Sequence, residues 1–217
     1  MKWISVILFV VGIAFVSYPK LQNYQVTNHQ EKIIDEFENR DLPQSLSYTA
    51  DSVNTMNGAL EIGPKVGGIE DSSEQSVDPV VSNKVLGTLE IKKINVKLPI
   101  LQGATQEHLE YGIGQLMGDS QIGAAGNVAL AAHRGYTYGR LFNRLDELRV
   151  GDELIATTSK GAYRYHVIDT FLVLPNDLSV LEEDGKESFI TLITCHPIKD
   201  PTHRLIVQAV LVNDSDL

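Results

Sequence analysis

Residues 191–197 read TLITCHP and residues 202–207 read THRLIV, and these two stretches carry the strongest structural signal in the chain. The first is rich in β-branched residues and reaches Cys195, the only cysteine in 217 residues. The second is an apolar run opened by Arg204, which follows Cys195 by nine residues. Short runs of this kind, joined by a Pro-containing turn, predict two strands. A loop between them brings Cys195 and Arg204 to the same end of a sheet.

A third strand is predicted at residues 127–132, where the sequence NVALAA ends just before His133 and a glycine turn. A thiol, an imidazole and a guanidinium at three strand ends form a set suited to acyl transfer. The thiolate is the attacking form of a cysteine, and an adjacent His or Arg favours it. In an exported chain a free thiol is open to oxidation, which argues against an idle role for Cys195. An inert, buried thiol is the alternative interpretation.

Other side chains compete for the two partner roles. His196 and His203 each adjoin another site residue in sequence, but neighbours along a strand point to opposite faces. Arg134 is the alternative arginine, and it faces away from the site if His133 faces in. For Arg204 the alternative is a surface ion pair, which stabilises a fold little. The remaining histidines are expected in a stalk, on a surface turn and in mid-strand, at His29, His108 and His166.

Three anchors taken together resemble a known family. The TLxTC ending at Cys195, Arg204 nine residues later, and the upstream AxHRG around His133 resemble the sortases, membrane-anchored cysteine transpeptidases of Gram-positive bacteria. Residues 133–142, HRGYTYGRLF, are most similar to the class D branch, and the resemblance extends over residues 84–213. It implies an eight-stranded β-barrel with Cys195 as the nucleophile and His133 as the general acid and base. Arg204 is then the group that stabilises the oxyanion or the substrate backbone.

The resemblance also implies the substrates. These are an LPxT-type sorting signal of an exported surface protein, cleaved after Thr through a thioacyl enzyme, and an amine of the peptidoglycan cross-bridge or stem peptide. Ala131, Ile193 and Thr194, which lie beside the catalytic positions, are candidates for binding the sorting signal. Two further interpretations stay open. One is a thiol hydrolase that releases exported proteins, and the other is a non-catalytic extracellular binding domain with a structural Cys195.

The composition excludes several classes of partner. A formal net charge of −10 argues against nucleic acid, because no basic stripe is present to neutralise phosphates. The sequence has no Cys/His cluster for zinc and no glycine loop for a phosphate, so no metal or cofactor is expected. The loop at residues 174–187 is acidic but lacks the regular spacing of a calcium loop, and it is expected to be solvated.

Residues 1–20 are predicted to form an uncleaved membrane anchor. The uncharged apolar run at residues 3–18 spans about 24 Å as a helix, slightly short of a hydrocarbon core of about 30 Å. Trp3 and Tyr18 stand at its two ends, where aromatic rings favour the membrane interface. The anchor places a single-pass protein in the cell membrane with its large C-terminal domain outside. A cleaved signal peptide is the alternative.

The rest of the chain divides into two parts. Residues 21–83 are expected to be a stalk and linker, with a weak helix at 21–40 and a largely flexible polar stretch after it. If residues 19–83 were wholly flexible, their reach would be on the order of 45 Å. Residues 84–217 are the expected catalytic domain, mostly β, with seven or eight strands and little helix, which is typical of a closed barrel or a sandwich. Short helical segments are expected at 106–112 and 141–148.

Overall fold

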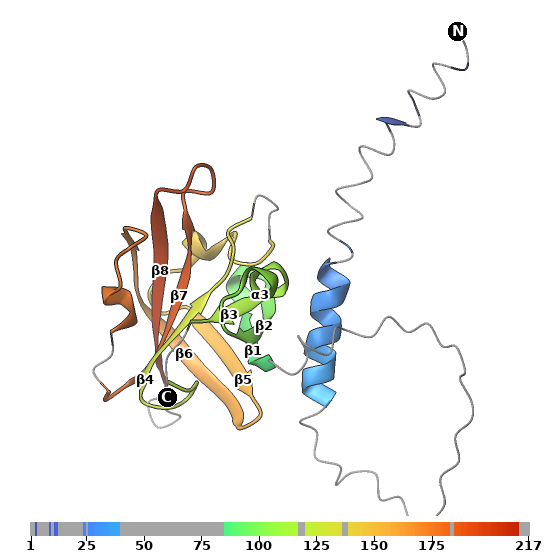
Figure 1. Ribbon diagram of the computed structural model, residues 1–217. Helices are drawn as coiled ribbons and strands as arrows, with labels where there is room; N and C mark the ends of the chain where they lie inside the picture. The colour runs from blue at the N-terminus through green and yellow to red at the C-terminus, as the bar shows by residue number, and fades with distance from the viewer. Residues whose placement is uncertain are drawn as a thin grey trace, which may run out of the picture.

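The chain folds into a closed eight-stranded barrel (Figure 1). The computed structural model describes residues 26–39, 85–116, 120–135, 139–182 and 185–212, together with Trp3, Phe9, Val11, Gly12 and Tyr24. The order of the strands around the barrel is β1-β2-β3-β4-β7-β8-β6-β5. The strands are β1 (Val85–Ile91), β2 (Val96–Gln102), β3 (Ile113–Gln115), β4 (Gly126–Ala131), β5 (Glu153–Thr158), β6 (Gly161–Val173), β7 (Ser188–His196) and β8 (His203–Leu211). The predicted eight-stranded, mostly-β architecture is confirmed.

The helices of this barrel domain are short, as expected. They are η2 (Lys92–Ile94), α3 (Gln106–Tyr111), η3 (Leu145–Glu147) and η4 (Ser179–Leu181). Thr105 caps α3, because its side chain accepts a hydrogen bond from the backbone N–H of His108 at 3.2 Å. The connections between strands therefore come from turns and single helical turns rather than from long helices.

The interior of the barrel is filled by one face of each strand. On β7, Ile190 and Leu192 are fully buried, and they pair with Ala209 and Val207 of β8 in the antiparallel register. Each such Ile or Leu stabilises the fold by about 1.5–3 kcal/mol relative to an exposed side chain. Side chains alternate along a strand, so the residues between these core positions point to the outer face of the barrel. The candidate site lies on that outer face.

A tyrosine hydroxyl is buried inside the barrel wall. The hydroxyl of Tyr165, in β6, is fully buried, accepts a hydrogen bond from the backbone N–H of Gly123 at 2.8 Å and shares another with Ser188 Oγ at 3.2 Å. Burial raises the pKa of Tyr165 above its usual value, because the phenolate would lose its hydration there. The phenol therefore stays protonated and joins the loop before β4 to the start of β7.

Replacing Tyr165 with Phe is expected to lower the free energy of unfolding by about 1–3 kcal/mol, because a buried N–H and a buried hydroxyl lose their partner. Urea denaturation followed by circular dichroism measures this change. The matched control is Tyr163→Phe, two residues earlier on the same strand, where the ring is only partly buried. Equal stability of the Tyr165→Phe variant and the wild type would show that the hydroxyl contributes nothing.

A helix at residues 26–39 lies against the barrel, beside β1 and β2 (Figure 1). Ile33 is buried together with Leu101 of β2 in a small apolar cluster. Near the end of the helix, Glu38 accepts a hydrogen bond and ion pair from Lys97 Nζ at 2.7 Å. The weak helix expected within residues 21–40 is therefore present, and it packs on the outer wall of the domain.

The anchor predicted over residues 1–20 lies outside the described residues, apart from Trp3, Phe9, Val11 and Gly12, as does the linker after residue 39. Within the part of the chain that the structure describes, no helix combines the length and the apolar character needed to cross a membrane.

The helix expected at residues 141–148 is replaced by turns and the single helical turn of η3. Leu141 has a φ of 49°, in the left-handed region, so a right-handed α-helix cannot begin there. The burial expected from the spacing is nevertheless present, because Leu141, Leu145 and Leu148 all belong to the main core. The spacing therefore identified the buried side chains but assigned them the wrong backbone conformation.

Candidate active site

Three neighbouring strands carry the residues singled out by the sequence. β4 and β7 run parallel, and their last paired positions are Ala131 and Ile193. Continuing this register by two residues sets His133 beside Cys195. On the other side of β7, Cys195 pairs directly with Arg204 of β8. The strand register thus leads from Arg204 through Cys195 towards His133, on three adjacent chain segments.

Two hydrogen bonds keep the end of β4 beside β7 past the last strand pair. The backbone N–H of Ala132 donates to the Ile193 carbonyl at 3.2 Å. The hydroxyl of Thr194 donates to the Ala132 carbonyl at 2.8 Å, and this threonine is only 2% exposed. The second threonine of the TLITC sequence therefore holds the residue that precedes His133. This contact explains why a hydroxyl is useful directly before the cysteine.

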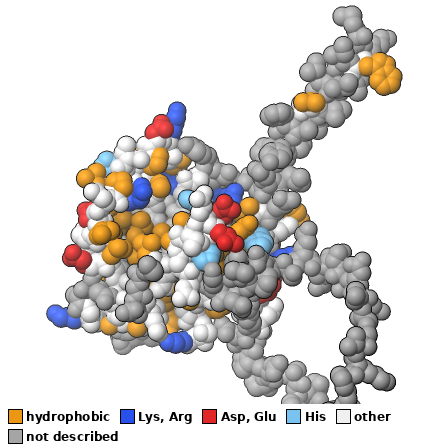
Figure 2. Space-filling view, viewed as in Figure 1, with side chains coloured by type: hydrophobic (Ala, Val, Ile, Leu, Met, Phe, Trp, Pro, Cys, Tyr) orange, Lys and Arg blue, Asp and Glu red, His pale blue; other side chains and the backbone are white. Residues whose placement is uncertain are grey.

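These positions lie on the outer face of the barrel. Cys195 is two residues from Ile193 and shares its face, whereas Leu192 and Thr194 point to the buried side. Cys195 and Arg204 are half-buried, and His133 is exposed. Figure 2 shows hydrophobic side chains gathered on the face over β7 and β8. A thiol at this position is reachable from solvent and bordered by apolar surface.

The loop between β6 and β7 covers part of this outer face. The side-chain amide of Asn127 donates to the carbonyls of Val180 and Glu182 at 3.0 and 3.2 Å. Its oxygen accepts a hydrogen bond from the fully buried hydroxyl of Thr191 at 2.8 Å. Thr191, the first threonine of TLITC, thus orients the side chain of Asn127, whose hydrogen bonds hold the loop against β4 and β7.

The loop before α3 approaches the same face from the other side. Gly114 of β3 pairs with Ala131, and a Cβ on Gly114 would lie 2.6 Å from the Cα of Ala104. Only a residue without a side chain allows so close a crossing. Ala131 and Ile193 therefore lie between two covering loops, on the floor of a strip of outer surface that leads to Cys195.

The proposed substrate contacts differ in their surroundings. Ala131 and Ile193 are half-buried and lie on the outer face with Cys195. Thr194 points to the opposite face, where its hydroxyl is engaged with the backbone of β4. A substrate on the outer surface can contact only the backbone of Thr194.

The other histidines lie elsewhere. His29 packs against Tyr111, with ring centroids 4.4 Å apart. The expectation that His108 lies on a surface turn is wrong, because it is 1% exposed and its Nδ1 contacts the Gly103 carbonyl at 2.9 Å. His166 is half-buried in the middle of β6. None of these three lies beside Cys195.

Sequence reasoning missed the role of Arg134. Its side chain is 3% exposed and forms an ion pair with Asp146 at 2.8 Å. Its Nη1 atom lies 2.7 Å from His196 Nδ1. The prediction that Arg134 faces away from the site is consistent with its burial, but the arginine contacts the residue that follows the cysteine. A charged residue between a strand end and a glycine was the only signal, and it does not reveal such a distant partner.

The acidic loop contains a carboxylate that shapes the backbone. The carboxylate of Asp177 accepts hydrogen bonds from the hydroxyl of Ser179 at 2.6 Å and from its backbone N–H at 3.0 Å. These bonds hold the pKa of Asp177 below its usual value. Among the described residues, no group of three or more His, Cys, Asp or Glu side chains is gathered to hold a metal ion.

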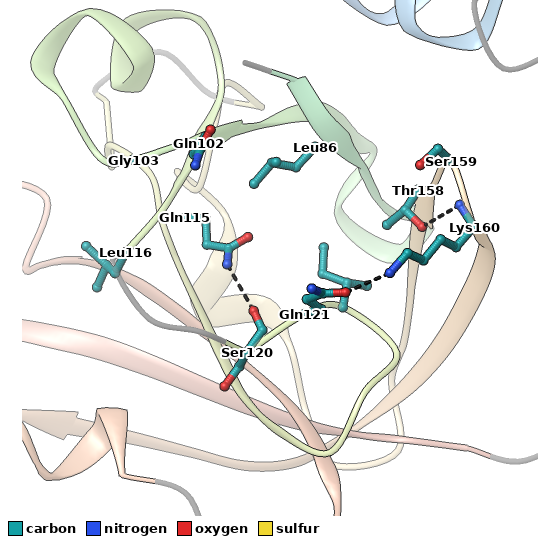
Figure 3. A pocket seen from close by; sticks show the side chains of 11 residues that line it. Leu86, Gln102, Gly103, Gln115, Leu116, Ser120, Gln121, Thr158, Ser159 and Lys160 are labelled. Atoms are coloured by element: carbon teal, nitrogen blue, oxygen red, sulfur yellow. Dashed lines mark hydrogen bonds between the residues drawn. The ribbon is translucent and has the colours of Figure 1, made fainter. Parts of the chain in front are cut away.

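A cavity of about 710 Å³ lies at an opening of the barrel between β2, β3 and the β5–β6 turn (Figure 3). Lys160 crosses its rim and donates to Gln121 Oε1 at 2.7 Å, and Gln115 donates to the Ser120 carbonyl at 3.2 Å. Its described lining is mostly amides, hydroxyls and aliphatic side chains and contains none of His133, Cys195 or Arg204. The thiol site is therefore a surface strip and is separate from this cavity.

Comparison with known proteins identifies the family of this chain. A sequence model of the Sortase domain matches residues 89–212, which is more than half of the chain. The chain therefore belongs to the sortase family, whose members are cysteine transpeptidases. The resemblance to the sortases that the sequence predicted is confirmed.

Individual relatives match over most of their length. The chain is 28% identical to Sortase A of Bacillus anthracis over 209 residues, which cover 96% of this chain and 93% of that protein. It is 28% identical to Sortase D of Bacillus subtilis (strain 168) over 155 residues, 71% of this chain and 68% of that one. A Clostridium perfringens Sortase D5 transpeptidase has the same fold, with a TM-score of 0.62 at 23% identity, over 86% of this chain and 99% of that chain. The expected similarity to class D is confirmed.

Proposed function

We propose that the protein cleaves an LPxT-type sorting signal after Thr and transfers the acyl part to a peptidoglycan amine. The observation that carries this proposal is the register in which Cys195 pairs with Arg204 across β7 and β8, while the β4–β7 register leads to His133. An extended peptide would lie on the strip of outer surface between the two covering loops. Ala131 and Ile193 would then contact its Leu and Pro side chains.

In the first half-reaction, the Cys195 thiolate attacks the carbonyl carbon of the substrate Thr. The oxygen of the tetrahedral intermediate becomes negative, and the Arg204 guanidinium stabilises that charge. The C–N bond then breaks as His133 donates a proton to the leaving amine, and a thioester remains on Cys195. The exposed position of His133 lets it exchange with solvent and with the second substrate.

In the second half-reaction, an incoming amine replaces the leaving amine. His133 takes a proton from it, the amine nitrogen attacks the thioester carbon, and the C–S bond breaks to regenerate Cys195. Two half-reactions that share one covalent intermediate give ping-pong kinetics. The proposed location is the outer face of the cell membrane, with residues 1–20 as the single-pass anchor and residues 21–83 as the connection to the catalytic domain.

A ligation assay tests this function. The full-length protein in detergent is incubated with an LPxTG peptide and an excess of an acceptor with a free amino-terminal glycine or a diaminopimelate amine, and the products are identified by mass spectrometry. The expected product joins the substrate Thr to the acceptor amine, and a peptide with the LPxTG residues scrambled serves as the control. Cleavage without ligation would instead favour the thiol hydrolase. Absence of turnover and of a protein–peptide adduct would favour the binding domain.

A further inference from the structure

Arg134 has an acceptor at each of its three guanidinium nitrogens. Nη2 pairs with the carboxylate of Asp146 at 2.8 Å, and Nε donates to the Asn143 carbonyl at 3.3 Å. Nη1 lies 2.7 Å from His196 Nδ1 and has a longer contact of 3.5 Å with the Cys195 carbonyl. A planar guanidinium with five N–H donors is the side chain that reaches so many separate acceptors at once.

The contact with His196 determines which ring nitrogen carries a proton. Arginine only donates hydrogen bonds, so Nδ1 of His196 must accept. The neutral imidazole then carries its proton on Nε2. Because β7 continues through His196, this ring points away from the face that holds Cys195. Arg134 therefore contacts the end of β7 on the face of the strand opposite to the thiol.

The same arginine joins this strand end to the segment that follows His133. Asn143 donates through Nδ2 to the Gly135 carbonyl, and the backbone N–H of Phe142 donates to the His133 carbonyl at 3.1 Å. Asp146, which is 51% exposed, supplies a negative charge from η3 to the nearly buried guanidinium. The chain near His133 and the chain near Cys195 are thus connected through one side chain.

We propose that Arg134 is a positioning residue that sets the relative placement of the nucleophile and the general acid. This inference rests on the proposed function for the roles of Cys195 and His133. Arg204 acts beside the thiol on the outer face, whereas Arg134 acts from the buried side through His196, the Cys195 carbonyl and the Asn143 backbone. Positioning errors of about 1 Å cost up to about 10²-fold in rate, so loss of this connection affects chemistry more than binding.

The test compares Arg134→Met, which keeps the length but removes every donor, with Arg134→Lys, which keeps one charge. We expect kcat for the ligation to fall by about 10–100-fold in the Met variant and by less in the Lys variant, while KM stays within about twofold. Arg164→Lys is the matched control, because Arg164 forms an exposed ion pair with Glu153 on the barrel surface. Melting curves check that each variant is folded.

Two further readouts do not need turnover. The ¹⁵N chemical shifts of His196, assigned by their loss in His196→Gln, are expected to show the Nε2–H tautomer in the wild type and a mixture in Arg134→Met. The alkylation rate of Cys195 by iodoacetamide is expected to change in the same variant. Suppose that the wild type neither ligates nor cleaves any peptide, while both readouts change in Arg134→Met. The proposed function then fails and the positioning role stands.

A folded Arg134→Met protein with wild-type kcat, or with unchanged His196 shifts, would overturn the inference. Should Arg134→Met not fold, Asp146→Asn carries the same test, because it removes only the partner charge from a half-exposed position. In Asp146→Asn, kcat is expected to fall and the His196 shifts are expected to move in the same direction as in Arg134→Met, each by less. Wild-type values for both in that protein would also overturn the inference.

Discussion

The Cys195→Ala variant is expected to lose both cleavage and ligation of the sorting peptide, with turnover falling by at least about 10⁴-fold. Both half-reactions pass through one thioester, and an alanine methyl group cannot form it. The fold should persist, because the change removes a single half-buried sulfur atom. Product mass spectra measure the loss, and circular dichroism checks the fold.

The covalent intermediate provides the complementary measurement. When the acceptor amine is omitted, the intact mass of the wild type is expected to rise by the mass of the acyl fragment, and the mass of Cys195→Ala is expected to stay constant. Hydroxylamine should release the fragment, since it cleaves thioesters. Turnover that survives in the Ala variant would exclude Cys195 as the nucleophile and contradict both the transpeptidase and the thiol hydrolase.

The Arg204→Lys variant is expected to lose about 10²–10³-fold in kcat, the cost of removing a donor to a developing oxyanion. The lysine keeps the positive charge but offers a point charge on a flexible stem instead of a planar fork. In the structure, Arg204 pairs with Cys195, and its Nη1 donates to the His203 carbonyl at 3.3 Å, which orients the side chain along the strand end. Steady-state kinetics with the LPxTG peptide measure the effect.

The control for this substitution is again Arg164→Lys, which exchanges the same groups at an exposed site on β6 and is expected to keep wild-type kinetics. A loss confined to KM would indicate that Arg204 binds the substrate backbone in the ground state rather than the oxyanion. Arg204→Lys with wild-type kcat and KM would remove Arg204 from the site altogether.

Much of the barrel and the pairing of Cys195 with Arg204 could be predicted because they follow from local patterns. Alternating apolar residues define strands and their buried faces, as at Ile190 and Leu192. A cysteine and an arginine on either side of a short turn must meet at one end of a strand pair. The place of His133 beside them stays a prediction, made from the end of the preceding apolar run and from the family resemblance.

Contacts between distant segments were not predictable in the same way. The alternation rule holds along β7 and correctly turns His196 away from Cys195, but it gives no information about what lies behind the sheet. Arg134 follows the end of β4, where the sheet geometry stops and side-chain directions are set by tertiary contacts such as Asp146. His108 was predicted to be exposed because its side chain is polar. The ring is nevertheless buried, and its Nδ1 atom forms a hydrogen bond with the backbone carbonyl of Gly103.

The helix at residues 26–39 determines where the long polar segment after it is attached to the domain. Since Ile33 fastens this helix to β2, and β1 begins at Val85, both ends of the intervening segment are held on the same domain. With the proposed anchor at residues 1–20 in the membrane, the connection first reaches the barrel through this helix, and residues 21–25 before it span at most about 18 Å when fully extended. The enzyme would then work close to the lipid surface, on sorting signals that have barely left it.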